Sequence, residues 1–264
     1  MASLARGLAA LPRSRFSTHV HHFERVDSSN QVARRLGRDG APDGTLVVAD
    51  EQTAGRGRRQ RRWVSPPGAG LYVSLLLRPR SAPPESGAAV QLIAGVAVAE
   101  LLQALLPTPP ALRWPNDCYV SDRKIAGVLV EAETSGEGFD FLVCGIGINV
   151  NHAVEDFPED LRESATSLRL QVGHETPLIG VLGGLLDSFD LWEGAWQSYG
   201  LAPVRQRWLE LSPETQHGRV GAQTDAGLLE GTADGLTDDG RLRVRTADGV
   251  QVLAAGEVVR LRPG

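Results

Sequence analysis

Hydrophobic residues recur at two different spacings along the chain, and the spacing predicts where strands and helices lie. Short apolar runs rich in branched residues predict strands at Thr45 to Asp50 and at Leu71 to Leu77. The second run is apolar at nearly every position, which predicts a strand buried on both faces. Three further runs are typical of strands: Leu112 to Trp114, Ile125 to Glu131 and Phe139 to Val150, with Gly136 and Gly138 marking the turn before the last.

Apolar residues at steps of three and four predict two helices in the first half of the chain. One short helix follows a strand that ends at Val26. Its N-cap groups would come from Ser28, Ser29 and Asn30, and Gly37 would end it. A longer buried helix is predicted from Val90 to Leu106, because Pro107 cannot continue it.

The same spacing predicts two helices in the second half. Thr176 would cap an amphipathic helix that begins at Pro177 and reaches Trp192. A second helical stretch is predicted from Glu193 to Leu211. This stretch carries Trp196, Tyr199 and Trp208, and its tryptophans are expected in the core rather than in a site.

After Pro213 the pattern changes to short strands separated by Asp-Gly turns. The runs are Leu228 to Ala233, Leu242 to Thr246 and Glu257 to Leu261, with turns at Asp239-Gly240 and Asp248-Gly249. Such spacing predicts a small antiparallel barrel of about fifty residues.

These elements together predict an α+β fold with a mixed, mostly antiparallel sheet and packed helices, because several strands are joined by hairpins rather than by crossover helices. We expect three segments. Residues 1–19 form a flexible extension, residues 20–212 a large domain and residues 213–264 a small barrel.

The composition of the chain mainly argues against certain classes of protein and site. The 27 basic and 32 acidic residues give a formal charge of −5, so no overall field attracts nucleic acid or a membrane surface. Cys118 and Cys144 lack metal or redox spacing and are expected to be buried thiols in a reducing compartment. Residues 1–18 carry three arginines and no acid, which fits a transit peptide or a frayed terminus, and we favour the terminus. No membrane span is predicted, because Gln91, Glu100 and Gln103 interrupt the longest apolar run.

The segment from Asp50 to Ser74 contains the densest candidate chemistry. Five arginines lie within seven residues, from Arg56 to Arg62, between glycines and before Trp63. Guanidinium groups and backbone N–H groups beside glycine suit a polyanionic ligand. Three other interpretations are a solvated basic surface, a dinucleotide fingerprint at Gly55–Gln60 and a nucleic-acid contact. A strand-like run after the loop disfavours the fingerprint, and the acidic chain disfavours nucleic acid.

Three further motifs combine polar groups with strand ends. Arg113-Trp114-Pro115-Asn116-Asp117 offers an amide and a carboxylate where Pro115 keeps the chain extended. Lys124, within the run from Arg123 to Glu131, is the only lysine among the 27 basic residues, which indicates a role for a compact ammonium. Gly145-Ile146-Gly147-Ile148-Asn149-Val150-Asn151 places glycines inside a strand, which predicts close approach of a ligand or another backbone.

Taken in order, the arginine loop, Trp-Pro-Asn-Asp, Lys-Ile-Ala-Gly-Val-Leu and Gly-Ile-Gly-Ile-Asn resemble the biotin–protein ligases, from about residue 20 to the end. The resemblance implies a class II synthetase-like catalytic domain at residues 20–212 and an SH3-like C-terminal domain. It implies an ATP-dependent ligase that forms biotinyl-5′-AMP and diphosphate. The enzyme then transfers biotin to a specific lysine of a biotin carboxyl carrier protein.

The resemblance also implies the roles of individual residues. The biotin contacts would be Ser28, Ser29, Asn30, Gln52, Arg56, Gly57, Arg58 and Lys124. The nucleotide contacts would be Arg61, Trp63 (stacked on adenine), Arg113, Asn116, Asp117 and Asn149. For catalysis we expect Lys124 and Arg58 to stabilise the charge that develops in the transition state, while Asp117 orients Mg²⁺. Arg113 departs from the lysine more usual in the family, which keeps the charge but changes its geometry.

The implied partner is the carrier domain of a biotin-dependent carboxylase, and a homodimer through the catalytic sheet is an option. With about twenty residues before the catalytic domain, we expect a monofunctional cytoplasmic enzyme that binds no operator DNA and no membrane. Three alternatives are kept. They are a lipoate or octanoyl ligase or transferase of the same fold, a nucleic-acid-binding module, and a biotin sensor without catalysis.

Overall fold

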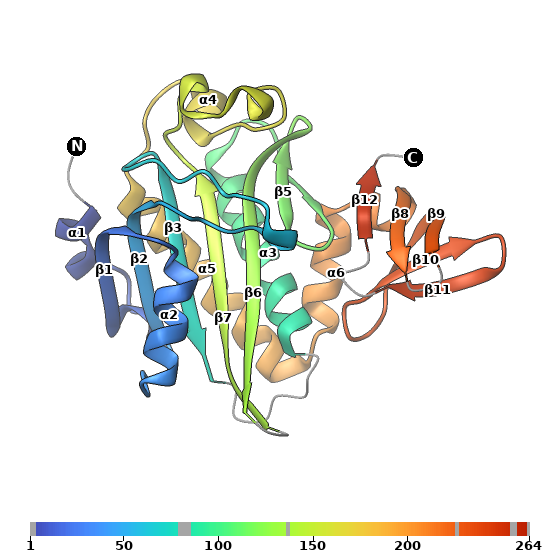
Figure 1. Cartoon of the computed structure of the whole chain (residues 1–264), viewed down its shortest axis with the longest axis horizontal. Helices are drawn as coiled ribbons and strands as arrows, with labels where there is room; N and C mark the ends of the chain where they lie inside the picture. Colours follow the sequence, from blue (N-terminus) through green and yellow to red (C-terminus); the bar gives the residue numbers. More distant parts are fainter. Residues whose placement is uncertain (1–3, 79–85, 136–137, 225–226, 254–257, 263–264) are drawn as a thin grey trace.

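The structure, a computed structural model, describes residues 4–78, 86–135, 138–224, 227–253 and 258–262. Within these ranges it contains a large seven-stranded sheet with helices on both faces and a smaller five-stranded sheet at the C-terminal end (Figure 1). The α+β prediction is therefore confirmed.

The seven strands of the large sheet lie in the order β1-β2-β3-β7-β6-β5-β4. Only β1 and β2 are parallel, and every other pair is antiparallel. Long strands occupy the centre, where β3 is buried at every position. The bounds are β1 His19–Val26, β2 Thr45–Gln52, β3 Gly70–Leu77, β4 Ala111–Arg113, β5 Asp117–Val120, β6 Arg123–Ser135 and β7 Gly138–Asn149.

Strand β5 was not predicted. It is only four residues long, and it forms a hairpin with β6 through Ser121 and Asp122, whose φ angles are 48° and 59°. Two left-handed residues between antiparallel strands match the twist of a tight hairpin, but serine is a weak sequence signal for this conformation. The predicted turn residue Gly136 lies outside the described residues, while Gly138 begins β7.

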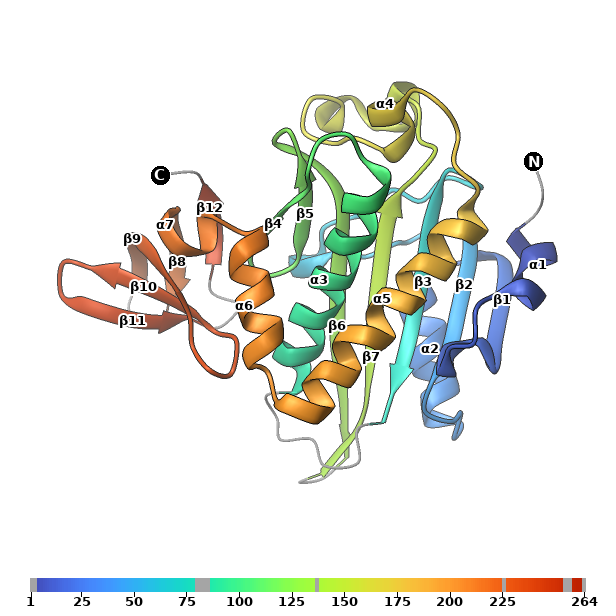
Figure 2. The same ribbon diagram turned by 180° about the vertical axis from the view of Figure 1, so that it is seen from behind.

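Helices cover the two faces of the large sheet unequally. One long helix, α2 (Ser29–Arg38), lies on the face seen in Figure 1, whereas α3 (Ser86–Leu105), α5 (Leu178–Tyr199) and α6 (Ala202–Leu211) cover the opposite face (Figure 2). Glu133 of β6 pairs with Arg34 and Arg38 and so ties α2 to the sheet. The shorter helical segments are α1 Leu4–Gly7, η1 Leu8–Ala10, η2 Arg15–Ser17, η3 Arg58–Gln60, η4 Val154–Asp156, η5 Glu159–Leu161, α4 Leu168–Val172 and α7 Glu214–His217.

Several helix boundaries differ from the sequence prediction. Helix α5 continues past Trp192 to Tyr199, and the break falls at Gly200, whose φ of 73° ends the helix. Pro177 rather than Thr176 occupies the N-cap of α5. Tyr199 lies in the last turn of α5 and is 77% exposed, whereas Trp208, predicted to lie in the core, is fully buried. Gly37 does not end α2, which continues to Arg38. The glycine instead serves packing, because a side chain there would collide with Phe141.

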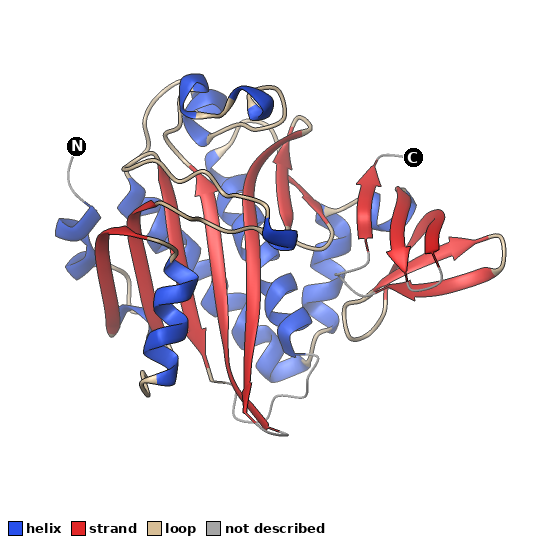
Figure 3. Cartoon of the chain, in the orientation of Figure 1, coloured by secondary structure: helices blue, strands red, loops and turns tan. Residues whose placement is uncertain are grey.

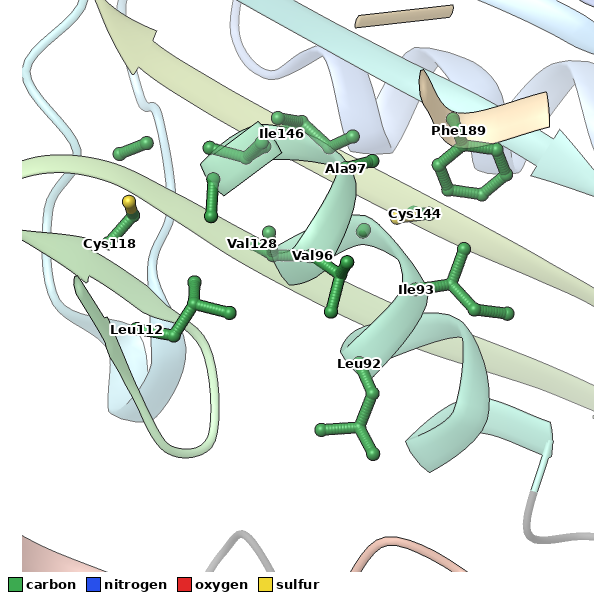
Figure 4. Close-up of a cluster of buried hydrophobic side chains, with 14 of the residues drawn as sticks. Leu92, Ile93, Val96, Ala97, Leu112, Cys118, Val128, Cys144, Ile146 and Phe189 are labelled. Atoms are coloured by element: carbon green, nitrogen blue, oxygen red, sulfur yellow. The ribbon is translucent and has the colours of Figure 1, made fainter. Parts of the chain in front are cut away.

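The main hydrophobic core lies between the sheet and the rear helices. Leu92, Ile93, Val96 and Ala97 of α3 meet Val128, Cys144, Ile146 and Phe189 (Figure 4). Helix α3 is long and apolar enough to span a membrane by length and composition. However, 67% of that window is buried inside the protein, which is the pattern of a core helix. A second cluster beneath α2 consists of Val32, Ala33, Val47, Leu76, Phe141 and Val143.

The segment before β1 differs from the frayed terminus that was expected, as far as it is described. Phe16 is fully buried against the edge of Phe189, with the ring centres 5.5 Å apart. Arg15 donates to Glu193 at 2.6 Å. These contacts hold residues 4–18 against α5, because a short apolar segment gains burial that the local sequence does not reveal.

The C-terminal sheet is antiparallel throughout, in the order β11-β10-β9-β8-β12, and fits the predicted small domain (Figure 3). Strands β8 and β11 were not predicted, and the predicted Glu257 lies outside the described residues. The domain boundary between residues 212 and 213 stays a prediction. The bounds are β8 Arg219–Thr224, β9 Gly227–Leu236, β10 Leu242–Thr246, β11 Gly249–Leu253 and β12 Val258–Arg262.

Candidate functional site

The candidate site lies on the face of the large sheet that carries α2. Alternate residues of β7 point to this face, and they change along the strand from Phe141 and Val143 under the helix to Gly145, Gly147 and Asn149 beyond it. Near the first turn of α2 the strand therefore presents glycines, which opens a hollow above the sheet.

The two strand glycines make room for side chains of the site itself. A methyl group on Gly145 would collide with Asn30, and one on Gly147 would lie 2.6 Å from the indole of Trp63. A methyl group on Gly127 of β6 would lie 3.3 Å from the same indole. Close approach was predicted here for a ligand or another backbone, and in the structure these side chains make it.

A cluster of buried polar groups forms one end of the hollow. The Oε1 of Gln52 accepts from the backbone N–H of Ser29 at 2.8 Å and lies 3.1 Å from its hydroxyl. Ser74 Oγ lies 2.8 Å from Ser29 Oγ and 2.6 Å from Asn30 Oδ1. The Nδ2 of Asn30 donates to Glu131 Oε2 at 2.8 Å. These contacts fix the orientation of each amide.

A hairpin formed by residues 52–65 crosses in front of β7 and β6 (Figure 1). Its backbone is paired: Gln52 N–H donates to Ser65 O at 3.2 Å, and Trp63 N–H donates to Gly55 O at 2.9 Å. The arginine run occupies the tip. Because the tip is folded back over the sheet, Arg58 and Trp63 are carried into the hollow.

Charged groups converge at the other end. Lys124 Nζ lies 2.6 Å from Asp117 Oδ1 and 5.5 Å from the ring centre of Trp63. Arg58 Nη1 donates to Asn116 Oδ1 at 3.3 Å. Burial lowers the pKa of Arg58, as do Arg59 and Arg61, against the raising effect of Asp117. Confined cations of this kind favour an anionic ligand, which would offset their mutual repulsion.

The position of Lys124 is fixed by its backbone on two sides. It pairs with Tyr119 of β5 across the hairpin, and its N–H donates to Ser164 O at 2.8 Å. Its carbonyl accepts from Thr166 N–H at 2.9 Å, and Thr166 O in turn accepts from Asn149 Nδ2 at 3.0 Å. The loop after β7 thus holds both Lys124 and Asn149 at the wall of the hollow.

All of the site residues predicted from the sequence line one cavity of about 520 Å³. They are Ser28, Ser29, Asn30, Gln52, Arg56, Gly57, Arg58, Arg61, Trp63, Arg113, Asn116, Asp117, Lys124 and Asn149. The arrangement separates a neutral polar end from a cationic end. Their individual roles stay predictions.

Four residues that support this site were not predicted from the sequence. Ser74, Ser65 and Glu131 hold the polar cluster, and Tyr119 lines the charged end. Ser74 had a readable signal, because it is the one serine in the apolar run Gly70–Leu77. The others had none, because their partners lie far away in the sequence.

Residues 22–149 match the model of the Biotin/lipoate A/B protein ligase family, and residues 219–261 match that of the Biotin protein ligase C terminal domain. The chain is 36% identical over 240 residues to a biotin--[acetyl-CoA-carboxylase] ligase of Paracoccus denitrificans, covering 89% of this chain and 97% of the relative. The chain therefore belongs to the biotin protein ligase family.

Two further matches agree with this assignment. A bifunctional ligase/repressor of Bacillus spizizenii is 33% identical over 244 residues, covering 91% of this chain and 73% of the relative. A biotin protein ligase from Aquifex aeolicus in complex with biotin and ATP superposes with a TM-score of 0.78 at 30% identity. That match covers 94% of this chain and all of the Aquifex chain.

Proposed function

We propose that this chain activates biotin with ATP and transfers it to a lysine of a carrier protein. In the first step a biotin carboxylate oxygen attacks the α-phosphate, which forms biotinyl-5′-AMP and releases diphosphate. In the second, the carrier amine attacks the acyl carbonyl, and AMP leaves. The observation that carries the proposal is the single cavity in which the polar cluster faces Lys124, Arg58 and Asp117.

The unused hydrogen-bonding capacity of the polar cluster fits a ureido ring. Both lone pairs of Gln52 Oε1 face Ser29, while one of the two Nε2 protons serves Ser65 at 2.9 Å, which leaves one donor. Asn30 uses Nδ2 on Glu131 and Leu129, and its oxygen keeps one acceptor site beyond Ser74. A ureido group offers one carbonyl acceptor and two N–H donors, so it complements this set.

The charged end suits the reacting groups. The carboxylate and the α-phosphate are both anions and repel each other until cations lie between them. We assign this work to Lys124 and Arg58, which stabilise the negative charge of the pentacoordinate transition state. Trp63 would present its indole to adenine. Asn116, Asn149 and Arg61 would contact the nucleotide, and Arg113 lines the same side of the cavity.

The donor set also fits Mg²⁺ that arrives with the nucleotide. In the ranges that the structure describes, no three His, Cys, Asp or Glu side chains gather to hold a metal ion. Asp117 supplies a single carboxylate, and Mg²⁺ commonly uses one or two carboxylates together with substrate phosphates. When bound, the ion would neutralise part of the triphosphate charge.

The proposed partner is the biotin carboxyl carrier domain of a carboxylase, and the proposed compartment is the cytoplasm. Cys118 and Cys144 are free buried thiols, which fits a reducing compartment. A homodimer and the lack of operator binding belong to the same proposal. Light scattering on the purified chain and a binding titration with duplex DNA test them.

Biotin-dependent exchange of labelled diphosphate into ATP tests the first step. We expect exchange with Mg²⁺ and biotin, and a loss of at least about a hundredfold in Lys124→Ala, because one preorganised charge contributes about 10²–10³ in rate. Arg123→Ala, a neighbouring cation outside the predicted site, is the matched control. Tight binding of biotin without any exchange would contradict the ligase and would favour the alternative of a biotin sensor without catalysis.

A lipoate-activating enzyme is the second candidate, since the matching family model includes lipoate ligases. Lipoate has no ureido ring and would leave the donor of Gln52 and the acceptor of Asn30 unused. Running the same exchange assay with lipoate in place of biotin separates the two. Equal rates with biotin and lipoate would contradict the assignment of the polar cluster to the ureido ring.

A further inference from the structure

Two consecutive residues of the cavity wall are bonded to the C-terminal region of the chain. The guanidinium of Arg113 meets the carboxylate of Glu214 through two parallel hydrogen bonds, Nε to Oε2 at 2.5 Å and Nη2 to Oε1 at 2.8 Å. The indole of Trp114 donates to the carbonyl of Gly240 at 3.2 Å. Figure 2 shows β4, which ends at Arg113, beside α6 and α7.

The next residues in the chain reach the reacting groups. Asn116 accepts from Arg58, and Asp117 pairs with Lys124. Asn116 N–H also donates to the carbonyl of Arg113 at 3.2 Å, which closes a tight turn. A displacement of Arg113 would therefore be passed directly to the two side chains that contact the catalytic cations.

Arg113 is held as a guanidinium in particular. Its Cζ lies 4.0 Å above the ring centre of Tyr119, and its side chain and that of Glu214 are only 21% and 17% exposed. Burial opposes the charged form, but the hydrogen bond and charge of Glu214 raise the pKa of Arg113 overall. A forked, stacked contact uses the planar guanidinium, and a lysine ammonium cannot reproduce it.

The anchor of this ion pair is rigid. Glu214 begins α7, and the adjacent Thr215 is fully buried between Ser212 at 2.5 Å and the indole of Trp208 at 3.4 Å. Trp208 in turn packs into the main core. The carboxylate of Glu214 is thus fixed relative to both α6 and the C-terminal sheet.

We propose that Glu214 is a positioning residue, which clamps Arg113 and thereby fixes the nucleotide side of the cavity from the C-terminal domain. Arg113 then acts as a structural link and not as a phosphate ligand. This inference rests on the proposed function. It explains why an arginine stands before Trp-Pro-Asn-Asp in this chain, since the clamp needs its fork.

The test measures three variants in the diphosphate-exchange assay. Two are the single variants Glu214→Gln and Arg113→Lys, and the third is a double variant that carries both Arg113→Glu and Glu214→Arg. We expect each single variant to raise the KM for ATP about tenfold, the effect of losing about 1.4 kcal/mol from a partly buried pair. The KM for biotin stays within about twofold, because the polar cluster lies at the other end. The exchanged pair recovers part of the loss.

Glu210→Gln is the matched control. This carboxylate on α6 also pairs with an arginine, Arg207 at 2.9 Å, but lies away from the cavity, so both KM values stay unchanged. Titration of biotin without ATP checks the folded site in every variant, and Glu214→Gln keeps the wild-type affinity for biotin.

Three outcomes overturn the clamp. A KM for ATP that is unchanged or lower in Glu214→Gln means that Glu214 only competes with phosphate for Arg113. Equal losses for biotin and ATP mean a general loss of structure. If the wild type shows no biotin-dependent exchange, the proposed function is wrong and the clamp has no role. If only the clamp is wrong, the wild type still shows exchange.

Discussion

At the scale of single residues, the site depends on groups that support other groups. Ser74 is fully buried in β3, and its single hydroxyl proton can serve Ser29 or Asn30. In Ser74→Ala a buried acceptor loses its partner, which costs about 1–3 kcal/mol when the acceptor stays unsatisfied. We expect the KM for biotin to rise about tenfold or more while the KM for ATP stays unchanged.

The control for Ser74→Ala is Ser212→Ala, which removes an equally buried hydroxyl outside the cavity. Steady-state exchange assays of both variants, with biotin and ATP varied separately, make the comparison. A KM for biotin that moves equally in both variants would contradict a local role for Ser74.

Gly147 allows a second prediction at this scale. A methyl group there would lie 2.6 Å from the indole of Trp63, so Gly147→Ala displaces the indole from the sheet. We expect diphosphate exchange to fall at least about tenfold, because a displacement of about 1 Å at an active site can cost a hundredfold. Gly180→Ala, with nothing within 4 Å of the added methyl, is the control and keeps full exchange.

At the scale of elements, the types of the long segments were predicted more reliably than their ends. The apolar run of β3 and the Asp-Gly turns are local signals, and both regions formed as predicted. The boundary between α5 and α6 was misplaced, because Gly200 stops the helix through a left-handed φ that the preceding periodicity does not indicate. Strand β5 was missed because it is short and depends on β6 for its pairing.

One contact between elements predicts a dependence of stability on pH. His152, after β7, is buried against Tyr72 of β3, with Nε2 3.3 Å from the phenol oxygen, and it stacks on Phe157. Burial lowers the pKa of His152 from 6.5 to about 4. The unfolded chain therefore binds the proton more tightly, and the free energy of unfolding falls as the pH drops from about 6.5 to about 4.

Chemical denaturation of the wild type and of His152→Gln at several pH values measures this effect. The wild type should lose on the order of 2–3 kcal/mol across that range from this group, and the variant should lose less by that amount. The exposed His174→Gln is the control and keeps the wild-type slope. Parallel slopes for all three proteins would show that His152 has the same pKa in the folded and the unfolded chain, which contradicts the prediction.

At the scale of the whole molecule, the amino groups are almost absent. Lys124 is the only lysine, and it is paired with Asp117 inside the cavity. We expect an enzyme held with excess biotin and ATP to gain biotin on at most Lys124 and the N-terminal amine, since released adenylate acylates amines. Peptide mass spectrometry measures this, with a lysine-rich bystander protein in the same tube as the positive control. Biotin on several other residues of the enzyme would contradict the prediction.

The sequence by itself determined the family, the class of fold and the membership of the cavity, because these depend on local patterns and on motifs whose residues are neighbours in the chain. Only the tertiary structure decided which groups support them. Ser74 meets Asn30 across 44 residues, and Arg113 meets Glu214 across 101. Such contacts leave no periodicity in the sequence, because they arise from the packing of distant strands and helices.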